Sequence, residues 1–326
     1  MIKKSFSEIS RPIDEELSRF TVLFKQSLKS KVALVELVTR YILKQKGKKI
    51  RPILVLLSSK LCGGITDRSY RGATLVELLH TATLVHDDVV DNAETRRGFP
   101  SINFVWKNKI AVLMGDYLLA RGLILAVDGN DFDFLRVITN TVKRMSEGEL
   151  LQISKTRKLD IDEETYFRII SDKTASLLST CCEVGALAST SDEKKINAMK
   201  EFGENLGIAF QIRDDILDFI GTQNVFGKAL GADIKEKKIT LPLIYALNKS
   251  SKTDSKKIIS LIKKGAKKNE IQEIINYVHE NGGINYAEKV ASDYAQKAIA
   301  NLNIFESSET HISLSSLVSF VVERKI

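Results

Sequence analysis

The pattern of apolar and polar positions is helical from end to end. Apolar residues recur at three- and four-residue spacing in 34–43, and the longer stretches 164–189 and 199–221 repeat that pattern. The stretch 72–91 is apolar on most sides, as expected of a helix at the centre of a bundle. No segment alternates apolar and polar residues in the way a half-buried strand does. The pattern predicts long helices and no sheet.

The predicted helices end where glycine, proline or a short polar run interrupts the pattern. These interruptions lie at 63–64, 98–100, 129–130, 189–192, 227–231 and 282–283. The chain has no internal repeat of fixed period and no low-complexity linker. We therefore expect an all-α fold, a single-domain bundle of long helices covering residues 1–326.

Composition narrows the class of protein. The chain has 326 residues, 44% of them hydrophobic and 28% charged, which suits a globular protein with a large core. The apolar stretch 110–127 carries Asp116 and Arg121, so we interpret it as a buried helix rather than a membrane span. The odd number of cysteines, which are Cys62, Cys181 and Cys182, favours free thiols in a reducing compartment. Since the first residues do not resemble a signal peptide, we expect a cytoplasmic protein.

The net charge of +8 makes nucleic acid, an anionic membrane surface or phosphorylated substrates plausible partners. The densest positive stretch is 250–270, which holds seven lysines against Asp254 and Glu270. Aromatic residues do not interleave there, which argues against a platform for single-stranded nucleic acid. We interpret the stretch as a solvated helix face and expect no nucleic-acid partner.

The pattern Asp-Asp-x-x-Asp occurs twice, each time inside an apolar helical segment. The six residues are Asp87, Asp88, Asp91, Asp214, Asp215 and Asp218. The first and last aspartates of each copy are four residues apart, so they share one helix face with Cβ atoms about 5–6 Å apart. Like charges so placed repel and need a counter-charge. Oxygen ligands without histidine or cysteine suit Mg²⁺, which bridges carboxylates to substrate phosphates. A solvated acidic face would not need the apolar flanks.

Cations lie near both clusters in the sequence. They are Lys48, Lys49 and Arg51 before Pro52, Arg96 and Arg97, Lys173 beside Thr174, and Lys228 and Lys238. Arginine binds phosphate in a bidentate manner, and lysine supplies a compact charge. This set predicts a cavity for two phosphorylated groups, one held through metal and one held directly. His80 lies seven residues before Asp87, on nearly the same helix stripe, and is a candidate phosphate ligand.

The motifs and their order resemble the trans-prenyltransferases, the head-to-tail polyprenyl diphosphate synthases, over nearly the whole chain. The matching segments are GKKIRP, LLHTATLVHDDVVDNAETRRG, VLMGDYLLA, EGELLQ, SDKTASLL, FQIRDDILDFIG and GKALGADIKEKKITLPLIYAL. The resemblance is to long-chain members such as octaprenyl or solanesyl diphosphate synthases. It implies an all-α fold with a deep central cavity, and a homodimer. It also leaves room for a peripheral membrane contact when the product is released.

The resemblance also implies residue roles. The six aspartates would bind Mg²⁺, with three ions per site once substrate is bound, and they are implied to be catalytic together with Lys173. The allylic diphosphate would be held by Arg96, Lys173, Thr174, Gln211, Lys228 and Lys238. Isopentenyl diphosphate would be held by Lys48, Arg51, His80 and Arg97. The chain departs from the family pattern where Lys46 and Lys49 replace a common glycine and arginine, and where Lys107 replaces a common glycine.

The chemistry of such a site follows from its charges. Metal ions make the allylic diphosphate a better leaving group, and the carbon–oxygen bond breaks toward an allylic cation. An apolar cavity excludes the water that would capture that cation. The double bond of isopentenyl diphosphate attacks, and the departed diphosphate is a plausible acceptor for the proton then lost.

Small residues below the first cluster favour a long product. Ala82 and Thr83 lie one helical turn below Asp87, Leu79 lies two turns below, and no aromatic residue occurs between Ala73 and Asp91. In the family, a bulky aromatic just above this level stops short products. We therefore expect a hexaprenyl to decaprenyl product of the kind used for quinone side chains, with the tunnel floor around 123–126. The alternative is a short-chain farnesyl or geranylgeranyl diphosphate synthase.

Three other protein classes remain as rivals. A class I terpene cyclase usually carries an Asn/Ser/Glu motif in place of the second aspartate cluster. A non-catalytic prenyltransferase subunit tends to lose one cluster, whereas this chain keeps both. A basic nucleic-acid-binding protein leaves the aspartates in apolar segments unexplained.

Overall fold

The computed structural model describes residues 6–45, 47, 49–96, 98–220 and 230–323. Almost all of them are helical, which confirms the all-α prediction. In this part of the chain the strands are β1 (Thr95–Arg96) and β2 (Phe99–Pro100), an antiparallel pair with Thr95 opposite Pro100. This two-residue hairpin is too short to show alternation in the sequence, and the strand-free prediction missed it.

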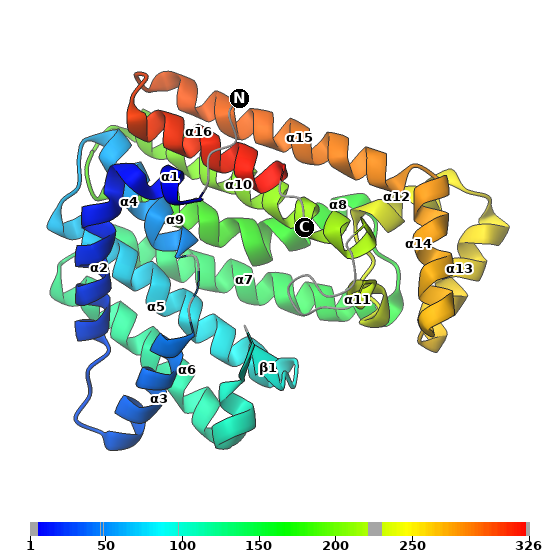
Figure 1. Ribbon diagram of the computed structural model, residues 1–326, viewed down its shortest axis with the longest axis horizontal. Helices are drawn as coiled ribbons and strands as arrows, with labels where there is room; N and C mark the ends of the chain where they lie inside the picture. Colours follow the sequence, from blue (N-terminus) through cyan, green and yellow to red (C-terminus); the bar gives the residue numbers. More distant parts are fainter. Residues whose placement is uncertain (1–5, 46, 48, 97, 221–229, 324–326) are drawn as a thin grey trace.

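The N-terminal helices lie along one edge of the bundle (Figure 1). They are α1 (Phe6–Ser10), the 3₁₀ turn η1 (Arg11–Ile13), α2 (Asp14–Ser27) and α3 (Ala33–Lys44). Phe20 and Phe24, one turn apart on α2, stack with ring centroids 5.6 Å apart. This aromatic pair lines a cavity described below.

Long helices form the centre of the bundle and carry the motifs. They are α4 (Ile50–Cys62), α5 (Asp67–Val90), α6 (Ile102–Asp128), α7 (Phe132–Lys158), α8 (Glu163–Ile170), the π-helical segment η2 (Ser171–Ala175), α9 (Ser176–Leu187) and α10 (Glu193–Ile220). Because α8, η2 and α9 follow one another without a break, they form one helix with a widened turn in the middle.

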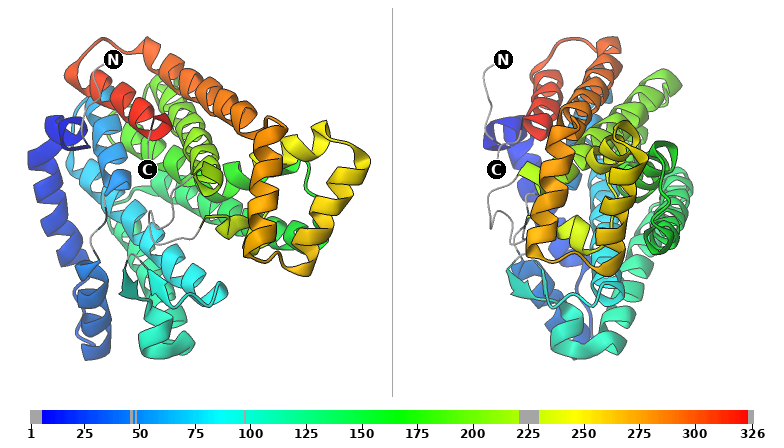
Figure 2. Two further views of the ribbon diagram at one scale, coloured as in Figure 1. Left: turned by 45° about the vertical axis from the view of Figure 1, so that its right-hand side comes forward. Right: turned by 90° about the vertical axis from the view of Figure 1, so that its right-hand side faces the viewer.

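The C-terminal helices complete the bundle. They are α11 (Ala232–Lys235), α12 (Leu241–Lys249), α13 (Lys252–Lys264), α14 (Lys268–Glu280), α15 (Gly283–Asn301), η4 (Leu302–Ile304) and α16 (Glu309–Val322). Helices α13 and α14 project from one end, whereas α15 and α16 lie beside α10 (Figures 1 and 2). The lysine-rich stretch 250–270 covers α13 and the start of α14, where all seven lysines are exposed, as the interpretation of a solvated face requires.

Three clusters of buried side chains hold these helices together. The largest joins α4, α5, α9 and the first half of α10, through residues such as Leu54, Val76 and Phe202. A second surrounds the end of α10 and the C-terminal helices, and a third lies between α5 and α6. The structure does not test whether residues 1–326 form one domain, so that stays a prediction.

Helix α6 is less buried than the sequence led us to expect. It is long and apolar enough to cross a membrane by length and composition, yet only 33% of its apolar window is buried. Its outer face exposes Val112, Leu113, Ile124 and Val127, each 41–56% accessible. The prediction of a buried helix was therefore wrong for this face. Its apolar residues occur all round the helix, and such a pattern cannot show which side the rest of the chain covers.

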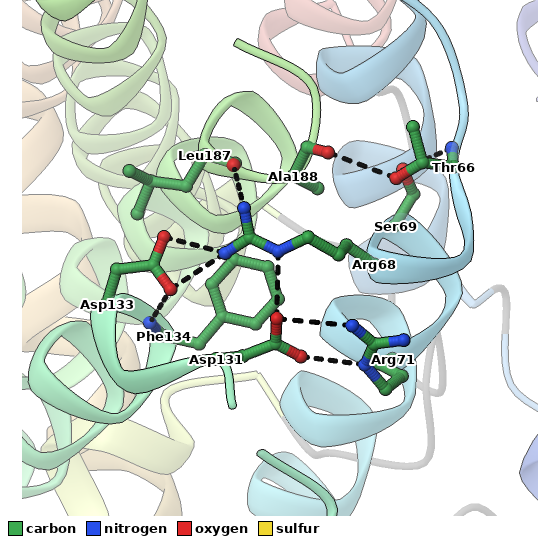
Figure 3. A network of polar contacts seen from close by, with 9 residues as sticks. All are labelled: Thr66, Arg68, Ser69, Arg71, Asp131, Asp133, Phe134, Leu187 and Ala188. Carbon is green, nitrogen blue, oxygen red and sulfur yellow. Dashed lines mark hydrogen bonds and ion pairs between the residues drawn. The ribbon is translucent and has the colours of Figure 1, made fainter. Parts of the chain in front are cut away.

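A closed network of charges fixes the first turns of α5 at the opposite end from its aspartates (Figure 3). Arg68 Nε donates to Asp131 at 2.8 Å, and its Nη2 donates to Asp133 at 2.7 Å. Arg71 Nε donates to the other oxygen of Asp131 at 2.7 Å. Arg68 also bonds the Leu187 carbonyl oxygen at 3.0 Å. This network joins α5 to the start of α7 and the end of α9, and we call it the floor clamp.

Candidate active site

The first aspartate cluster lies at the end of α5. Asp87 and Asp88 are in its last turn, and the Asp91 N–H donates to the Asp87 carbonyl oxygen at 2.8 Å, so helical spacing continues through Asp91. Burial raises the pKa of Asp87, and the charges of Glu149 and Asp91 add to that rise, whereas Lys173 opposes it. Asp87 therefore faces α7 and η2, where Glu149 and Lys173 are located.

Asp88 faces another side of α5. Its side chain is 4% exposed, and Arg96 Nε in β1 donates to its carboxylate at 2.6 Å. Burial raises the pKa of Asp88, and the hydrogen bond and charge of Arg96 oppose that rise. The hairpin that contains Arg96 therefore returns a cation to the helix that it follows.

The second cluster lies near the end of α10. Asp215 is 4% exposed and accepts hydrogen bonds from Tyr166 Oη at 2.6 Å and Gln211 Nε2 at 2.8 Å. Burial, together with the charge of Asp233, raises the pKa of Asp215 to about 7. Such a carboxyl favours a nearby cation, because a positive charge would stabilise its ionised form.

Asp218 has a different environment on the same helix. Its two carboxylate oxygens accept hydrogen bonds from the N–H groups of Ala232 and Asp233, at 3.0 and 3.1 Å. Its carbonyl oxygen also accepts from the Gly231 N–H at 3.0 Å. Asp218 therefore holds the start of α11 against α10, which brings Asp233 toward Asp215.

A small cavity of about 170 Å³ lies beside the second cluster. The predicted residues that line it are Lys173, Thr174, Gln211, Asp215 and Lys238. Lys173 contacts Glu149, and its Nζ donates to Gln152 Oε1 at 3.0 Å. Thr174 Oγ1 donates to Gln211 Oε1 at 2.9 Å, so the amide of Gln211 connects Thr174 with Asp215. We call this space the π-side cavity, because η2 forms part of its wall.

Lys238 connects the π-side cavity with the first cluster. Burial lowers the pKa of this lysine, but the hydrogen bond from its Nζ to Glu236 and the charges of Asp233 and Asp91 outweigh burial and raise it. The Lys238 ammonium is therefore close enough to interact with Asp91 of the first cluster and with Asp233, which lies near the second cluster.

A larger cavity of about 790 Å³ lies beside α5, and among the described residues its lining shares none with the π-side cavity. Its charged lining includes Lys49, Arg51, Glu77, His80, Asp88 and Arg96. Its apolar lining includes Phe20, Phe24, Ile42, Leu43, Leu84, Val85 and Ile102. His80 Nδ1 lies 3.9 Å from Glu77 Oε2. We call this space the α2-side cavity.

The structure divides the predicted binding residues between these two cavities. Arg51 and His80, predicted for isopentenyl diphosphate, share the α2-side cavity, and the allylic residues Lys173, Thr174, Gln211 and Lys238 share the π-side cavity. Arg96 departs from this division because it lines the α2-side cavity through its pair with Asp88. Lys48, Arg97 and Lys228 lie outside the described residues.

Sequence reasoning missed several residues of the site. Tyr166 donates a hydrogen bond to Asp215, and Gln152 accepts one from Lys173. The π-side cavity is also lined by Asp233 and Lys155. Gln152 ends the motif EGELLQ and could have been found there. Tyr166 carries no such local signal, since it reaches Asp215 only through the packing of α8 on α10.

Two of the three predicted chain-length residues belong to different clusters of buried side chains. Leu79 and Thr83 are four residues apart on one stripe, and Leu79 belongs to the largest core cluster. Ala82 is 2% exposed and packs in the α5–α6 cluster with Met114 and Leu118. Residues three and four apart on a helix are neighbours, so Ala82 and Thr83 each adjoin Leu79. The grouping of Leu79, Ala82 and Thr83 as chain-length residues stays a prediction.

The carboxylates suit a metal ion whose ligands come partly from the protein and partly from a bound substrate. Among the described residues, no three His, Cys, Asp or Glu side chains converge on one point. A closed protein cage for a metal is thus missing in that part of the chain. Raised pKa values at Asp87, Asp88 and Asp215 nevertheless show carboxyls that would gain from a cation. Mg²⁺ suits such a site because it keeps waters and binds phosphates beside one or two carboxylates.

Comparison with known proteins decides the family. Residues 32–278 match the family model described as polyprenyl synthetase. The chain belongs to the polyprenyl synthetase family. Prenyl diphosphate synthases are transferases, so the chain is an enzyme of that class.

Relatives within the polyprenyl synthetase family differ in product. An all-trans-nonaprenyl-diphosphate synthase (geranyl-diphosphate specific) from Rhodobacter capsulatus is 34% identical over 318 residues, with 97% of both chains covered. A geranylgeranyl diphosphate synthase from Saccharolobus solfataricus is 33% identical over 331 residues, with 98% of this chain and 99% of the relative covered.

Solved structures of the family match the fold over the whole chain. A polyprenyl synthase from Caulobacter crescentus, complexed with calcium and isoprenyl diphosphate, aligns with a TM-score of 0.92. It is 31% identical, and the alignment covers 100% of both chains. The bundle described here is thus the isoprenoid synthase fold.

Proposed function

We propose that this enzyme condenses isopentenyl diphosphate head to tail with an allylic diphosphate, in a Mg²⁺-dependent reaction that gives an all-trans polyprenyl diphosphate. The observation that carries this proposal is the presence of two cation-lined cavities, one lined by Asp215 and the other by Asp88. Two diphosphates need two such sites, and each cavity contains one aspartate of the two clusters.

The allylic diphosphate would bind in the π-side cavity. Lys173 and Lys238 supply charge there, while Thr174 and Gln211 supply hydrogen bonds. Isopentenyl diphosphate would bind in the α2-side cavity against Arg51 and His80. Lys48, Arg97 and Lys228 are proposed to assist these sites, as the family pattern implies.

Mg²⁺ is proposed to be held by the aspartates of both clusters, with three ions per site when substrate is bound. When present, it supplies positive charge that stabilises the departing diphosphate. Arg96 holds Asp88 in place, and Tyr166 and Gln211 hold Asp215. Asp87 and Asp214 are half-buried near the ends of their helices, and Asp91 is exposed.

The chain's own residues exclude water from the reacting carbons. Leu84, Val85 and Ile102 form an apolar wall beside Asp88 and Arg96. An allylic cation formed beside such a wall meets the double bond of isopentenyl diphosphate before it meets water. We nominate no basic side chain for the final proton, which the departed diphosphate can accept.

We further propose a long-chain product, of hexaprenyl to decaprenyl length. The small side chain of Thr83 one turn below Asp87 supports this, because it leaves the interior stripe of α5 free of aromatic rings. The tunnel floor is proposed near Leu123 and Ala126, which pack with the largest core cluster. A short-chain product is the competing hypothesis, and relatives of similar identity act at both lengths.

The remaining proposals concern partners and location. We propose a cytoplasmic homodimer without a nucleic-acid partner, with peripheral membrane contact at product release. The exposed apolar face of α6 supports a dimer, because Val112, Leu113, Ile124 and Val127 form a large apolar patch for a monomer to leave in water. Sedimentation of the wild type and of Leu113→Lys tests it, and a monomeric wild type would rule it out.

The central experiment is an elongation assay. Purified enzyme is given isopentenyl diphosphate with dimethylallyl, geranyl, farnesyl or geranylgeranyl diphosphate, with Mg²⁺ or with a chelator, and products are separated by chromatography. We expect Mg²⁺-dependent elongation to long products. No elongation with any primer would overturn the proposed condensation reaction, and farnesyl diphosphate as the main product would overturn only the long-chain proposal.

A further inference from the structure

The segment that carries Lys173 and Thr174 is a π-helical turn in an otherwise α-helical rod. The Ser176 N–H donates to the Ser171 carbonyl oxygen, five residues back, instead of to the residue four back. Short π-helical turns are rare, and they occur frequently at functional sites. The widened turn rotates Lys173 and Thr174 relative to α8 and therefore decides where both side chains point.

Two glycines on neighbouring helices make room for this turn. A Cβ atom on Gly148 of α7 would lie 3.0 Å from the Cβ of Asp172 and 3.1 Å from the nitrogen of Lys173. A Cβ atom on Gly207 of α10 would overlap the backbone of Ala175. The turn is thus gripped between two helices at closest approach, and a small change in either contact would move it.

An arginine outside both cavity linings holds the near edge of the turn. Arg144 of α7 donates from Nε to Asp172 at 2.8 Å and from Nη2 to Ser171 Oγ at 2.8 Å. The same guanidinium bonds both carboxylate oxygens of Glu204 on α10, at 2.9 and 3.3 Å. Ser171 Oγ donates to Glu204 as well, at 2.5 Å. These four residues form a network that we call the π clamp.

The π clamp and the π-side cavity share one turn and involve consecutive residues of it. Ser171 and Asp172 face Arg144 and Glu204, whereas the next two residues face Gln152, Glu149 and Gln211. The Arg144 side chain is 28% exposed, and Asp172 and Glu204 are 18% and 25% exposed. A partly shielded guanidinium with two carboxylates has strong, directional bonds, so it can fix backbone position.

We propose that Arg144, with Asp172 and Glu204, is a positioning unit that sets the π turn so that Lys173 and Thr174 meet the allylic diphosphate. Arg144 acts through the turn and does not touch substrate. The role rests on the proposed function for its substrate, and on the described contacts alone for its geometry. Lysine cannot replace it, because a single ammonium cannot bond Asp172, Ser171 and Glu204 in the planar pattern of a guanidinium.

The test compares two arginines that each hold two carboxylates. Arg144→Met breaks the π clamp, and Arg68→Met breaks the floor clamp at the N-terminal end of α5. We expect Arg144→Met to raise KM for the allylic diphosphate on the order of 10–100-fold, as loss of a supporting contact around a binding residue does. KM for isopentenyl diphosphate should stay unchanged, because Arg51 and His80 lie in the other cavity. Arg68→Met should lower thermal stability and leave both KM values unchanged.

A second measurement does not depend on activity. Amide hydrogen exchange at residues 171–176 of the substrate-free enzyme should become faster in Arg144→Met than in Arg68→Met, when each is compared with the wild type. If Arg144→Met fails to fold, Ser171→Ala and Glu204→Gln remove one bond each, and Arg144→Lys should restore thermal stability more fully than allylic KM.

The outcomes separate this inference from the proposed function. If the wild type does not elongate any primer, the proposed function fails, and the exchange data still judge the clamp. If the wild type elongates but the two methionine variants show equal allylic KM and equal exchange at 171–176, the positioning role is overturned and the π clamp is only a stabilising contact.

Discussion

Most charges at the two ends of α5 have the signs that a helix disfavours. Arg68 and Arg71 follow Asp67 near its N-terminus, and Asp87, Asp88 and Asp91 lie at its C-terminus. A helix dipole stabilises the reverse arrangement, with carboxylates at the start and cations at the end. Each end therefore needs compensation from elsewhere in the fold, and the two ends obtain it differently.

The floor clamp is closed. Both oxygens of Asp131 accept hydrogen bonds from arginine, and Asp133 accepts from Arg68 and from the Phe134 N–H. Asp131 and Asp133 begin α7, where negative charge is favourable. Two arginines face two carboxylates in the contacts of Figure 3, and the network joins three helices without leaving an excess of either sign.

At the other end of α5, where the candidate site lies, the described charges do not form a balanced network of this kind. Burial raises the pKa of Asp87, Asp88 and Asp215, although Arg96 and Lys173 lie nearby. Among the described residues, the nearby cations therefore do not offset the effect of burial on these three carboxyls. A closed network serves stability, whereas an excess of buried negative charge costs stability and is suited to binding cations. This difference marks the site more clearly than the aspartates alone.

The largest expected effect comes from opening the floor clamp. Arg68→Met leaves Asp133 and one side of the buried Asp131 without a cation, which should lower the free energy of unfolding by about 3–5 kcal/mol. Denaturant melts of the wild type and the variant measure it. Elongation per folded molecule should not change. A stable Arg68→Met enzyme with reduced kcat would mean that the floor end communicates with the site.

At the other end of α5, we expect a substitution to reduce activity without reducing stability. Asp87→Asn removes a charge that is repelled by Glu149 and Asp91, so the metal-free protein should keep its stability or gain some. Elongation should fall by about 10²–10³-fold, the range for loss of one electrostatic group in an active site. Steady-state kinetics and melts of the same preparation measure both effects. Full activity of Asp87→Asn would remove this residue from the metal site.

Sequence alone predicted the helices and the charge pattern well, because both are local. Apolar spacing within 72–91 and 199–221 placed both aspartate clusters in helices, and four-residue spacing placed Asp87 and Asp91 on one face. Described breaks such as 63–64, 129–130 and 282–283 coincide with helix boundaries. Periodicity and glycine act over one or two turns, so no tertiary information was needed.

Features that depend on packing could not be predicted in this way. The pattern did not show that Ala82 faces α6, that the outer side of α6 is exposed, or that Arg96 pairs with Asp88. The π turn at 171–175 has no sequence signal of its own, because Gly148, Gly207 and Arg144 come from other helices. Each of these facts is set by a neighbour distant in sequence.

A smaller effect separates two neighbouring positions on α5. Thr83→Phe places a ring on the stripe of Leu79 and Asp87, and it should shorten the product with little loss of stability. Ala82→Phe places a ring against Met114 and Leu118, and it should cost about 1–3 kcal/mol by overpacking with a less altered product. Chromatography and melts compare the two. A shorter product from Ala82→Phe alone would indicate that the tunnel lies between α5 and α6.

A pH dependence of stability contrasts Asp215 with Asp131, two aspartates of similar burial. The pKa of Asp215 is raised from 3.8 to about 7, so the folded protein keeps its proton in a range where the unfolded chain has released it. Stability of the metal-free wild type should therefore fall as pH rises between these values, by at most about 1.4 kcal/mol per pH unit from this group. Asp215→Asn should flatten this slope, whereas Asp131→Asn should lower stability across the whole range by weakening the floor clamp. Urea melts from pH 4 to 8 measure both variants.

Mg²⁺ with pyrophosphate should also reduce the slope in the wild type, because a bound cation favours the ionised carboxylate. An unchanged slope in Asp215→Asn would show that burial of this carboxyl does not limit stability, and the contrast between the closed and open ends of α5 would then rest on Asp87 and Asp88 alone.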